Sequence, residues 1–415
     1  MAEAPASPTP GLGSNPLLNA GFLANPYPVY AMLRGTNPVF RPPVPINSGP
    51  GVFILTRHAD VEHVLRDKRF SVNRREAEVF QRFRDQLPVA LVEGPGGAQT
   101  MLMKDPPEHT RLRGLVNKAF TPRRIAELGP RLEKLMAELM DDVIARGETD
   151  LVHDIAEPVP AIVIAELLGV PAEDHRQFRE WSAELINRIP AFGEGRADMM
   201  GAFDKIIGYL RDQIENRRRQ PADDLLTGLI EARDARDALT EDEMVATAFL
   251  LLIAGHETTT NLIGNGTLAL LRNPDQLARL RAEPGLLDNA IEEMLRFDSP
   301  VQATVRVVTE AVTLGDHEIE PGALVITVLG AANRDPEVHP DPDRFDVARD
   351  PIRHLAFGFG THFCLGASLA RLEAKTVFRA LLDRTEHIER ANDDDLVYRP
   401  NPLLRGLSAL PLRVS

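Results

Sequence analysis

Cysteine is almost absent from this chain, because Cys364 is the only one among 415 residues. A single thiol excludes an internal disulfide framework and cannot by itself complete a tetrahedral zinc site. Long hydrophobic runs are missing as well. The longest one, near residues 244–255, is interrupted by Thr247 and Gly255, and it falls short of the about 20 apolar residues that cross a bilayer. We therefore expect a cytoplasmic protein with no membrane partner.

Positive charge is scarcer than negative charge. Lys and Arg number 47 against 61 Asp and Glu, and the formal net charge of −14 argues against nucleic acid as a partner. The composition is otherwise that of a large globular protein, with 43% hydrophobic residues. Neither an internal repeat nor an interior linker is visible. We expect a flexible leader at residues 1–16, rich in Pro, Ala and Ser, followed by a single monomeric unit at residues 17–415.

The one cysteine lies in a glycine-punctuated loop that runs directly into a helical segment, residues 365–384. A thiol ahead of a helix faces unpaired N–H groups and the positive end of the helix dipole, which favour thiolate. Gly358, Gly360 and Gly366 remove side chains where a flat cofactor would approach the backbone. Haem iron accepts one axial thiolate, and the porphyrin supplies further ligands. A merely buried apolar cysteine would explain none of these glycines.

Residues 357–366 read Phe-Gly-Phe-Gly-Thr-His-Phe-Cys-Leu-Gly and resemble the signature of the cytochrome P450 family, Phe-Gly-x-Gly-x-(His/Arg)-x-Cys-x-Gly. The resemblance implies a mainly α-helical fold with a small β-rich lobe near the N-terminus and a long central helix over haem b. It implies that Cys364 is the proximal iron ligand, and that Phe357 packs beside the sulfur and tempers its electron donation. His362 would reach a haem propionate. Phe359 stands where many bacterial relatives carry histidine, a position that the signature leaves open.

Helical periodicity dominates the middle of the chain, whereas residues 305–334 alternate and predict antiparallel strands. One helix stands out by its length. It begins at a capping box formed by Thr240 and Glu243 and runs for about 30 residues until Asn273-Pro274 stops it. Its middle, residues 254–260, reads Ala-Gly-His-Glu-Thr-Thr-Thr, which is a poor helical composition. Such a departure from helix propensity indicates a functional region.

Thr258 lies four residues after Ala254, so its hydroxyl can donate to that carbonyl, while Gly255 permits a local widening that admits a small molecule. The stretch resembles the family's motif Ala/Gly-Gly-x-(Asp/Glu)-Thr-(Thr/Ser). The resemblance implies that Glu257 and Thr258 are the acid and alcohol that deliver protons to bound O2. Taken alone, the two residues could equally be a solvated acid and a helix hydroxyl bonded to its own backbone. A zinc motif of the HExxH type fails, because Thr260 occupies the second histidine position.

Further residues match the family's supports for the cofactor. Glu293 and Arg296 are three apart on one helical face and can pair, and residues 342–345 read Pro-Asp-Arg-Phe, similar to the family's second arginine motif. The resemblance implies a buried network of Glu293, Arg296 and Arg344. It also implies that the haem propionates are held by four basic side chains: His109, Arg113, Arg306 and His362.

As a whole, the resemblance implies a monooxygenase that inserts one atom of O2 into an organic substrate. Electrons would come from NAD(P)H through a reductase and a separate ferredoxin or flavodoxin. Basic residues on the cysteine side of the haem could dock such an acidic partner: Arg111, Arg113, Lys118, Arg123, Arg124, Arg371 and Lys375. Two alternatives are a peroxide-driven peroxygenase and a non-catalytic protein that binds haem or a ligand. The intact acid-alcohol pair disfavours both.

The substrate pocket falls on segments that vary within the family. Here these are residues 70–101, 178–203, 301–304 and 401–404, with the surroundings of Leu251. Their character is apolar, which predicts a mid-sized hydrophobic substrate such as a macrolide, terpenoid, steroid or fatty acyl compound. The side chains expected to line the pocket are Leu251, Val301, Ala303, Thr304 and Leu403.

Overall fold

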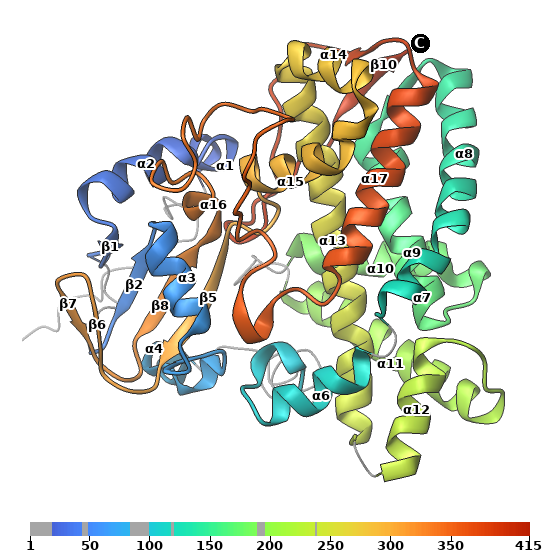
Figure 1. Ribbon diagram of the computed structural model, residues 1–415. Helices are drawn as coiled ribbons and strands as arrows, with labels where there is room; N and C mark the ends of the chain where they lie inside the picture. Colours follow the sequence, from blue (N-terminus) through green and yellow to red (C-terminus); the bar gives the residue numbers. More distant parts are fainter. Residues whose placement is uncertain (1–18, 44–48, 84–98, 118–119, 189–195, 237–238) are drawn as a thin grey trace, which may run out of the picture.

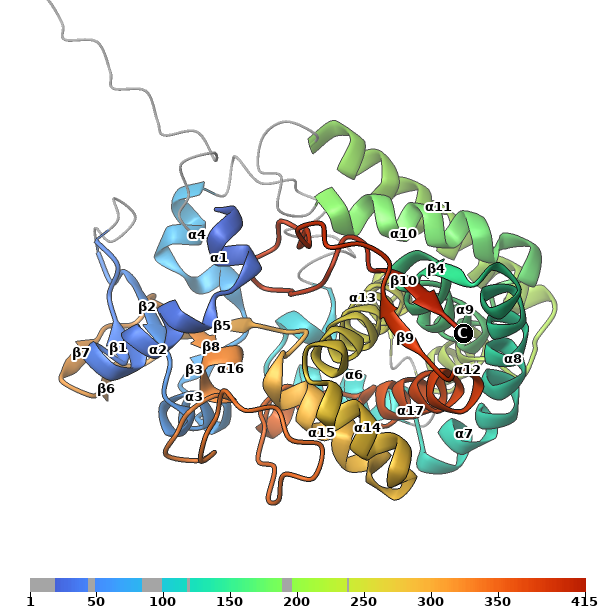
Figure 2. The ribbon, with the colours of Figure 1, turned by 90° about the horizontal axis from the view of Figure 1, so that it is seen from above.

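A long central helix, α13 (Glu241–Arg272), separates two parts of the molecule. In Figures 1 and 2 a small part built around β-strands lies on one side of α13, and a larger helical part lies on the other. This arrangement confirms the predicted fold, mainly α-helical with a small β-rich lobe. The structure is a computed structural model, and it describes residues 19–43, 49–83, 99–117, 120–188, 196–236 and 239–415. The expected leader at residues 1–16 lies outside these ranges.

Helix α13 begins at the predicted capping box. Thr240 Oγ1 accepts a hydrogen bond from the backbone N–H of Glu243 at 3.1 Å, and the Glu243 carboxylate accepts one from the N–H of Thr240 at 3.0 Å. The helix runs for 32 residues and ends at Asn273, as expected. Most of its side chains are buried because helices pack around it, chiefly α9 (Pro158–Leu168), α15 (Leu287–Phe297) and α17 (Ala367–Arg384).

The remaining helices follow the predicted periodicity, with one difference. Residues 122–147 form two helices, α7 (Pro122–Glu127) and α8 (Gly129–Arg146), with Leu128 between them. Helix α8 ends at Gly147, whose φ of 70° is readily adopted by glycine. The other helices are α1 (Ala20–Ala24), α2 (Tyr27–Thr36), α3 (His58–Arg66), α4 (Glu78–Phe83), α6 (Glu108–Val116), α10 (His175–Arg188), α11 (Arg196–Arg219), α12 (Leu225–Arg236), α14 (Pro274–Ala282) and α16 (Leu329–Ala332).

The β-rich part contains a five-stranded sheet in the order β1-β2-β8-β5-β3. It joins strands from two distant stretches of sequence, because β1, β2 and β3 come early in the chain and β5 and β8 come from residues 303–328. Strands β2 and β8 are parallel, and the other pairs are antiparallel. The strands are β1 (Val39–Phe40), β2 (Val52–Leu55), β3 (Phe70–Ser71), β5 (Ala303–Val308) and β8 (Leu324–Val328).

Two smaller sheets complete the strands. Strands β6 (Val312–Leu314) and β7 (His317–Ile319) form a hairpin, as the alternation of residues 305–334 predicts. Strand β10 (Pro411–Val414) pairs with β4 (Glu148–Asp150) and β9 (Ile388–Arg390), so the end of the chain is tied to the helical part. None of the described helices is both long enough and apolar enough to cross a membrane.

The core consists of separate apolar clusters on the two sides of α13. One cluster joins α8, α15 and α17 to the C-terminal half of α13, and a second joins α6, α9, α11 and α12 to its N-terminal half. A third lies between the five-stranded sheet and α3. Because α13 contributes to both helical clusters, it is held in both halves, and residues 254–260 at its centre are placed rigidly.

Candidate active site

The loop before α17 holds the single cysteine in a closed turn. The backbone N–H of Cys364 donates to the carbonyl oxygen of Phe357 at 2.9 Å, and the N–H of Gly358 donates to Leu355 at 2.8 Å. Gly358 has a φ of 70°, which explains a glycine at this position. A Cβ on Gly366 would meet no protein atom within 4 Å, so this side of the loop has space for a flat group.

Gly360 is required by its backbone conformation and by the close approach of another backbone segment. Its φ is also 70°, and a Cβ there would lie 2.8 Å from the backbone oxygen of Leu65 in α3. The glycine therefore allows α3 and the cysteine loop to approach each other closely. A flat cofactor is not needed to explain it.

The helix end favours the thiolate form of Cys364, as expected, but burial of the sulfur acts against it. Burial raises the pKa of the Cys364 thiol above its ordinary value. The backbone N–H of Gly366 and the charges of Arg113 and Arg371 oppose this rise without overcoming it. A bound cation would favour the ionised form of the sulfur.

A group of basic side chains meets beside this loop. The rings of His109, from α6, and His362 lie with centroids 4.1 Å apart. His109 Nδ1 and His362 Nε2 are buried and have no hydrogen-bond partner in the described part of the chain. Arg306, from β5, is 7% exposed, and within the described part of the chain its guanidinium donates to Thr304 and to the Val305 carbonyl. Four predicted propionate ligands, His109, Arg113, Arg306 and His362, are thus brought together.

The charges in this group are poorly compensated. Burial lowers the pKa of Arg306 to about 10, and the neighbouring charge of Arg74 adds to the effect. Burial and the charges of His109, Arg306 and Arg113 lower the pKa of His362 to about 3. Among the described residues, Asp105 is the carboxylate that acts on Arg306, and it also accepts hydrogen bonds from Ser71 and Val72.

Arg74 belongs to the same basic group and was missed by sequence reasoning. It lies in a 3₁₀ turn, Arg74–Glu76, just after β3, and its buried Nε has no partner among the residues that the structure describes. Burial lowers the pKa of Arg74. No local motif marks this arginine, because only the pairing of β3 with β5 brings it near Arg306. Buried cations with so little counter-charge fit a group that carries two carboxylates.

The centre of α13 opens on one face. Ala254 is exposed and Thr258 is half-buried, whereas the flanking residues Leu252, His256 and Glu257 are buried. Thr258 Oγ1 donates to the Ala254 carbonyl at 2.8 Å, as predicted. A Cβ on Gly255 would lie 3.2 Å from Ile164, so the glycine is required by packing against α9. Ala254 and Thr258 on this open face are small side chains, which leaves room beside the helix.

Glu257 lies next to Thr258 in sequence, but its carboxylate is held by other groups. Oε2 accepts a hydrogen bond from Arg399 Nη1 at 2.8 Å, and Oε1 accepts one from Asn261 Nδ2 at 3.3 Å. Arg399 also pairs with Glu157 at 2.5 Å, and Glu157 contacts His153 at 3.1 Å. The side chain of His153 is 56% exposed. A continuous series of polar groups therefore links the buried acid to the surface.

The predicted network around Glu293 exists, but one of its members is different. Both side chains of the Glu293–Arg296 pair are 0% exposed, with Arg296 Nε 2.6 Å from Glu293 Oε2. The side chain of Arg344 is 64% exposed and pairs with Asp346, so its assignment to the network is wrong. Arg349 takes the place instead, with Nε 3.2 Å from Glu293 Oε1. Arg344 contributes only its backbone carbonyl, which accepts from Arg296 at 3.2 Å.

Segments predicted to line the pocket do come together. Val301 forms a β-bridge with Leu404, and the N–H of Gln302 donates to the Leu403 carbonyl at 2.8 Å. Leu403 is exposed, while Ala303 is buried and Thr304 accepts a hydrogen bond from Arg306 at 2.7 Å. Parts of the other two segments, residues 84–98 and 189–195, lie outside the described residues.

Leu251 does not fit its predicted role as a pocket residue. It is 6% exposed and packs in the core cluster on the N-terminal half of α13. Leu250 and Ile253 are less buried and precede Ala254 on the helix by four residues and one. Leu250 therefore shares the open face with Ala254 and Thr258, because residues four apart lie on the same side of a helix.

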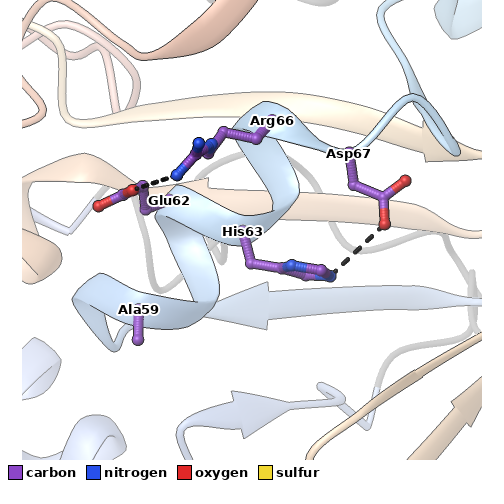
Figure 3. A pocket seen from close by; sticks show the side chains of 5 residues that line it. All are labelled: Ala59, Glu62, His63, Arg66 and Asp67. Atoms are coloured by element: carbon purple, nitrogen blue, oxygen red, sulfur yellow. Dashed lines mark hydrogen bonds and ion pairs between the residues drawn. The ribbon is translucent and has the colours of Figure 1, made fainter.

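An open groove also runs along α3, with a volume of about 540 Å³ (Figure 3). Its charged side chains pair along the helix, Arg66 with Glu62 at 3.2 Å and His63 with Asp67 at 3.6 Å. Such pairs four residues apart are typical of a solvated helix surface. We assign this groove no part in the active site. The described residues also contain no cluster of three or more His, Cys, Asp or Glu side chains that could hold a metal ion.

Comparison with known proteins agrees with this geometry. Residues 48–406 match the family described as Cytochrome P450. The chain is 44% identical over 407 residues to vitamin D(3) 25-hydroxylase from Pseudonocardia autotrophica, covering 97% of each chain. It is 43% identical over 410 residues to the cytochrome P450 monooxygenase PikC from Streptomyces venezuelae, covering 96% of this chain and 95% of that protein.

Solved structures are similar over nearly the whole chain. One is P450BioI in complex with an acyl carrier protein that bears hexadec-9Z-enoic acid, with a TM-score of 0.85, 37% identity, and coverage of 95% of this chain and 99% of that one. Another is the bacillaene polyketide synthase cytochrome P450 PksS from Bacillus subtilis 168, with a TM-score of 0.87, 36% identity, and coverage of 96% and 99%. The chain therefore belongs to the cytochrome P450 family, and it is a P450 monooxygenase with a haem cofactor.

Replacing Arg349 should destabilise the protein, whereas replacing Arg344 should not. Arg349→Gln removes a charged hydrogen-bond donor from buried Glu293 and should lower the free energy of unfolding by about 1–3 kcal/mol. Arg344→Gln changes an exposed side chain and should cost less than about 0.5 kcal/mol. Urea titration of the two holoproteins, followed by circular dichroism, compares them. Equal losses would contradict the assignment of Arg349 to the network.

A second missed residue, Glu373 in α17, should make stability depend on pH. It is 1% exposed, and burial raises its pKa to about 8, with a hydrogen bond to Thr259 opposing the shift. Between the ordinary value of 4.5 and about 8, the unfolded chain releases this proton and the folded protein keeps it. The contribution of Glu373 to the free energy of unfolding is therefore fully present below pH 4.5. It falls as pH rises towards 8, by at most about 1.4 kcal/mol per pH unit.

Glu373→Gln should remove this contribution, so the stability of the variant relative to the parent should grow between pH 5 and 8 and then level off. Urea titrations of holoprotein across this pH range measure the difference. Glu386→Gln, at an exposed position just after α17, is the matched control and should run parallel to the parent. Parallel profiles for Glu373→Gln as well would show that the buried carboxyl is not protonated.

Proposed function

We propose that the protein binds haem b through Cys364 and hydroxylates a mid-sized hydrophobic substrate with O2. The observation that carries this proposal is the group of basic side chains beside the Cys364 loop, in which Arg74 and Arg306 have little counter-charge and two histidine rings have buried nitrogens without a partner among the described residues. A lone buried thiol would not need such a group, whereas a flat cofactor with two carboxylates does. When bound, haem supplies the activation of O2, and the protein supplies binding, orientation and protons.

The side chains that would hold the cofactor come from separate elements. Cys364 would ligate the iron, and Phe357, Gly358 and Gly366 would form the loop around the sulfur. The propionates would be bound by the basic group defined above, His109, Arg113, Arg306, His362 and Arg74. Ala254 and Gly255 would border the other face of the cofactor, because the open side of α13 begins at Ala254.

Thr258 and Glu257 would deliver protons to the site on that open face. The Thr258 hydroxyl donates to the Ala254 carbonyl and therefore keeps its oxygen free to accept a hydrogen bond. The ion pair with Arg399 holds Glu257 as an acceptor, and the series Arg399, Glu157 and His153 connects it with solvent. Once its carboxylate rotates away from Arg399, Glu257 can take up a proton from water and pass it towards Thr258. Arg399 keeps its own protons and serves to position the acid.

The substrate would lie against the open face of α13 and the junction of residues 301–304 with residues 401–404. Leu250, Ile253, Val301 and Leu403 give this surface an apolar character. Relatives of this chain bear names of the matching chemistry, among them a vitamin D(3) 25-hydroxylase and a 6-deoxyerythronolide B hydroxylase. These names support a macrolide, terpenoid, steroid or fatty acyl substrate.

Electrons would come from NAD(P)H through a reductase and a ferredoxin or flavodoxin in the cytoplasm. The basic patch proposed to dock this partner is less positive than its sequence indicates. Arg113 remains near Cys364, but most of the other cations are paired with acids. The pairs are Arg111–Glu243, Arg123–Glu127, Arg124–Asp223, Arg371–Glu292 and Lys375–Asp288, and Lys118 lies outside the described residues.

Thr258→Ala should separate electron consumption from substrate oxidation. Without the hydroxyl, controlled proton delivery on the open face of α13 is lost, so product formed per NAD(P)H should fall at least about tenfold and peroxide release should rise. Thr247→Ala is the matched control, since Thr247 Oγ1 likewise donates to a carbonyl four residues earlier, at 2.7 Å, but lies in the buried N-terminal half of α13. Unchanged coupling in Thr258→Ala would overturn the proton-delivery role.

Optical titration of the ferric holoprotein should identify the substrate class. Steroids, terpenoids, macrolides and fatty acids would be added in turn, and a saturable shift of the Soret band towards high spin is expected for one class. A carbon monoxide spectrum after reduction checks thiolate ligation separately. A normal carbon monoxide spectrum with no shift from any compound would contradict the proposed free hydrophobic substrate, and an abnormal spectrum would contradict Cys364 as the ligand.

A further inference from the structure

An ion pair joins α15 to α17 beside the cysteine loop. Arg371 Nε lies 2.6 Å from Glu292 Oε1, and its Nη2 lies 2.8 Å from Oε2, so the two side chains meet in a two-point fork. His354 Nε2 contacts the same carboxylate at 3.0 Å. Burial opposes ionisation of Glu292, but the hydrogen bonds from Arg371 and His354 outweigh it and lower its pKa to about 2. Figures 1 and 2 show α15 and α17 side by side.

The fork fixes a positive charge over the ring of Phe357. The guanidinium carbon of Arg371 lies 4.6 Å from the ring centroid, within the range of a cation–π contact. His354 contacts the same ring at 5.8 Å between centroids. Phe357 in turn accepts the backbone N–H of Cys364. The charge of Arg371 also acts directly on the Cys364 sulfur, and Glu292 partly balances it.

We propose that the Glu292–Arg371 pair sets the reduction potential of the iron ligated by Cys364, with Arg371 raising the potential and Glu292 limiting the rise. Both are positioning residues, because they act through Phe357 and the sulfur and touch neither substrate nor O2. The inference rests on Cys364 as the ligand, as proposed above. Glu292 stands immediately before the Glu293–Arg296 pair in sequence, but its side chain serves this separate purpose.

The direction of each effect follows from charge. Reduction of the iron adds one negative charge to the site, and a fixed cation nearby favours the reduced form. Removing Arg371 should therefore lower the potential. Removing the charge of Glu292 leaves Arg371 uncompensated and should raise the potential. A merely structural role predicts a different result, since loosening the loop and admitting water would move the potential in the same direction for both variants.

The test is a spectroelectrochemical titration of holoprotein for the parent, Arg371→Gln and Glu292→Gln. We expect shifts of opposite sign, each at least about threefold in the equilibrium constant between ferric and ferrous forms, where tenfold corresponds to about 59 mV for one electron. Lys375→Gln is the matched control. It removes a cation one turn further along α17 that pairs with Asp288, and it should shift the constant by less than about twofold.

One further variant makes the outcome decisive. Arg371→Lys keeps the positive charge, so its equilibrium constant between ferric and ferrous forms should stay within about twofold of the parent value. A larger shift would show that the planar stack of the guanidinium on Phe357 matters, and not the charge. Should Arg371→Gln lose its haem, the sign for Glu292→Gln decides by itself, because a lowered potential would overturn the proposal. Shifts no larger than those of Lys375→Gln would overturn it as well. An abnormal carbon monoxide spectrum of the parent would instead show that the ligand assignment, on which the proposal depends, is wrong.

Discussion

The buried pair of Glu293 and Arg296 positions much of what lies around the cysteine loop. Arg296 donates to the carbonyls of Asn333 at 3.1 Å and Pro342 at 2.8 Å, and Glu293 accepts the N–H of Asp346 at 3.0 Å. One helix therefore organises a long irregular segment that has little regular hydrogen bonding of its own. Asn333 continues the chain of contacts, because its side-chain oxygen accepts the N–H of Leu355 at 2.6 Å, two residues before the loop begins. A salt bridge without any exposed surface is costly to form, and it is retained here where it fixes geometry.

The site also shows a conflict between stability and function. Basic side chains gather beside the loop with little opposing charge, and a buried glutamate in α17 keeps its proton near neutral pH. Each of these features weakens the protein taken alone. Binding an anionic cofactor would relieve the first of them, so the stability of the folded protein and occupation of the site are linked. The second feature remains in the holoprotein and limits stability at alkaline pH.

Sequence reasoning reached those parts of the site that are encoded locally. The capping box of α13, the bond from Thr258 to Ala254 and the turn around Gly358 each depend on residues a few positions apart. It failed where partners come from distant elements. Arg74 reaches the basic group only through strand pairing, and Arg399 meets Glu257 across 142 positions of sequence. Such contacts leave no periodicity or motif to read.

The two wrong assignments have a related cause. Arg344 was selected by its motif, yet its backbone carbonyl is what the network uses, and Arg349 supplies the guanidinium. Leu251 was selected as an apolar residue near the centre of α13, but a shift of one residue turns a helical side chain by about 100° and moves it from the open face into the core.

The cysteine loop is contacted by side chains and backbone from both parts of the molecule. On the side of the sheet, α3 touches Gly360 through the carbonyl of Leu65, and Arg66 stacks on Phe359 at 5.2 Å. On the helical side, Arg371 stacks on Phe357. The loop therefore links the sheet part to α17. A movement of one relative to the other would displace the backbone that carries the sulfur. The vibrational frequency of the iron–sulfur bond would then report on the relative position of the two parts, although this bond lies away from the proposed substrate surface on α13.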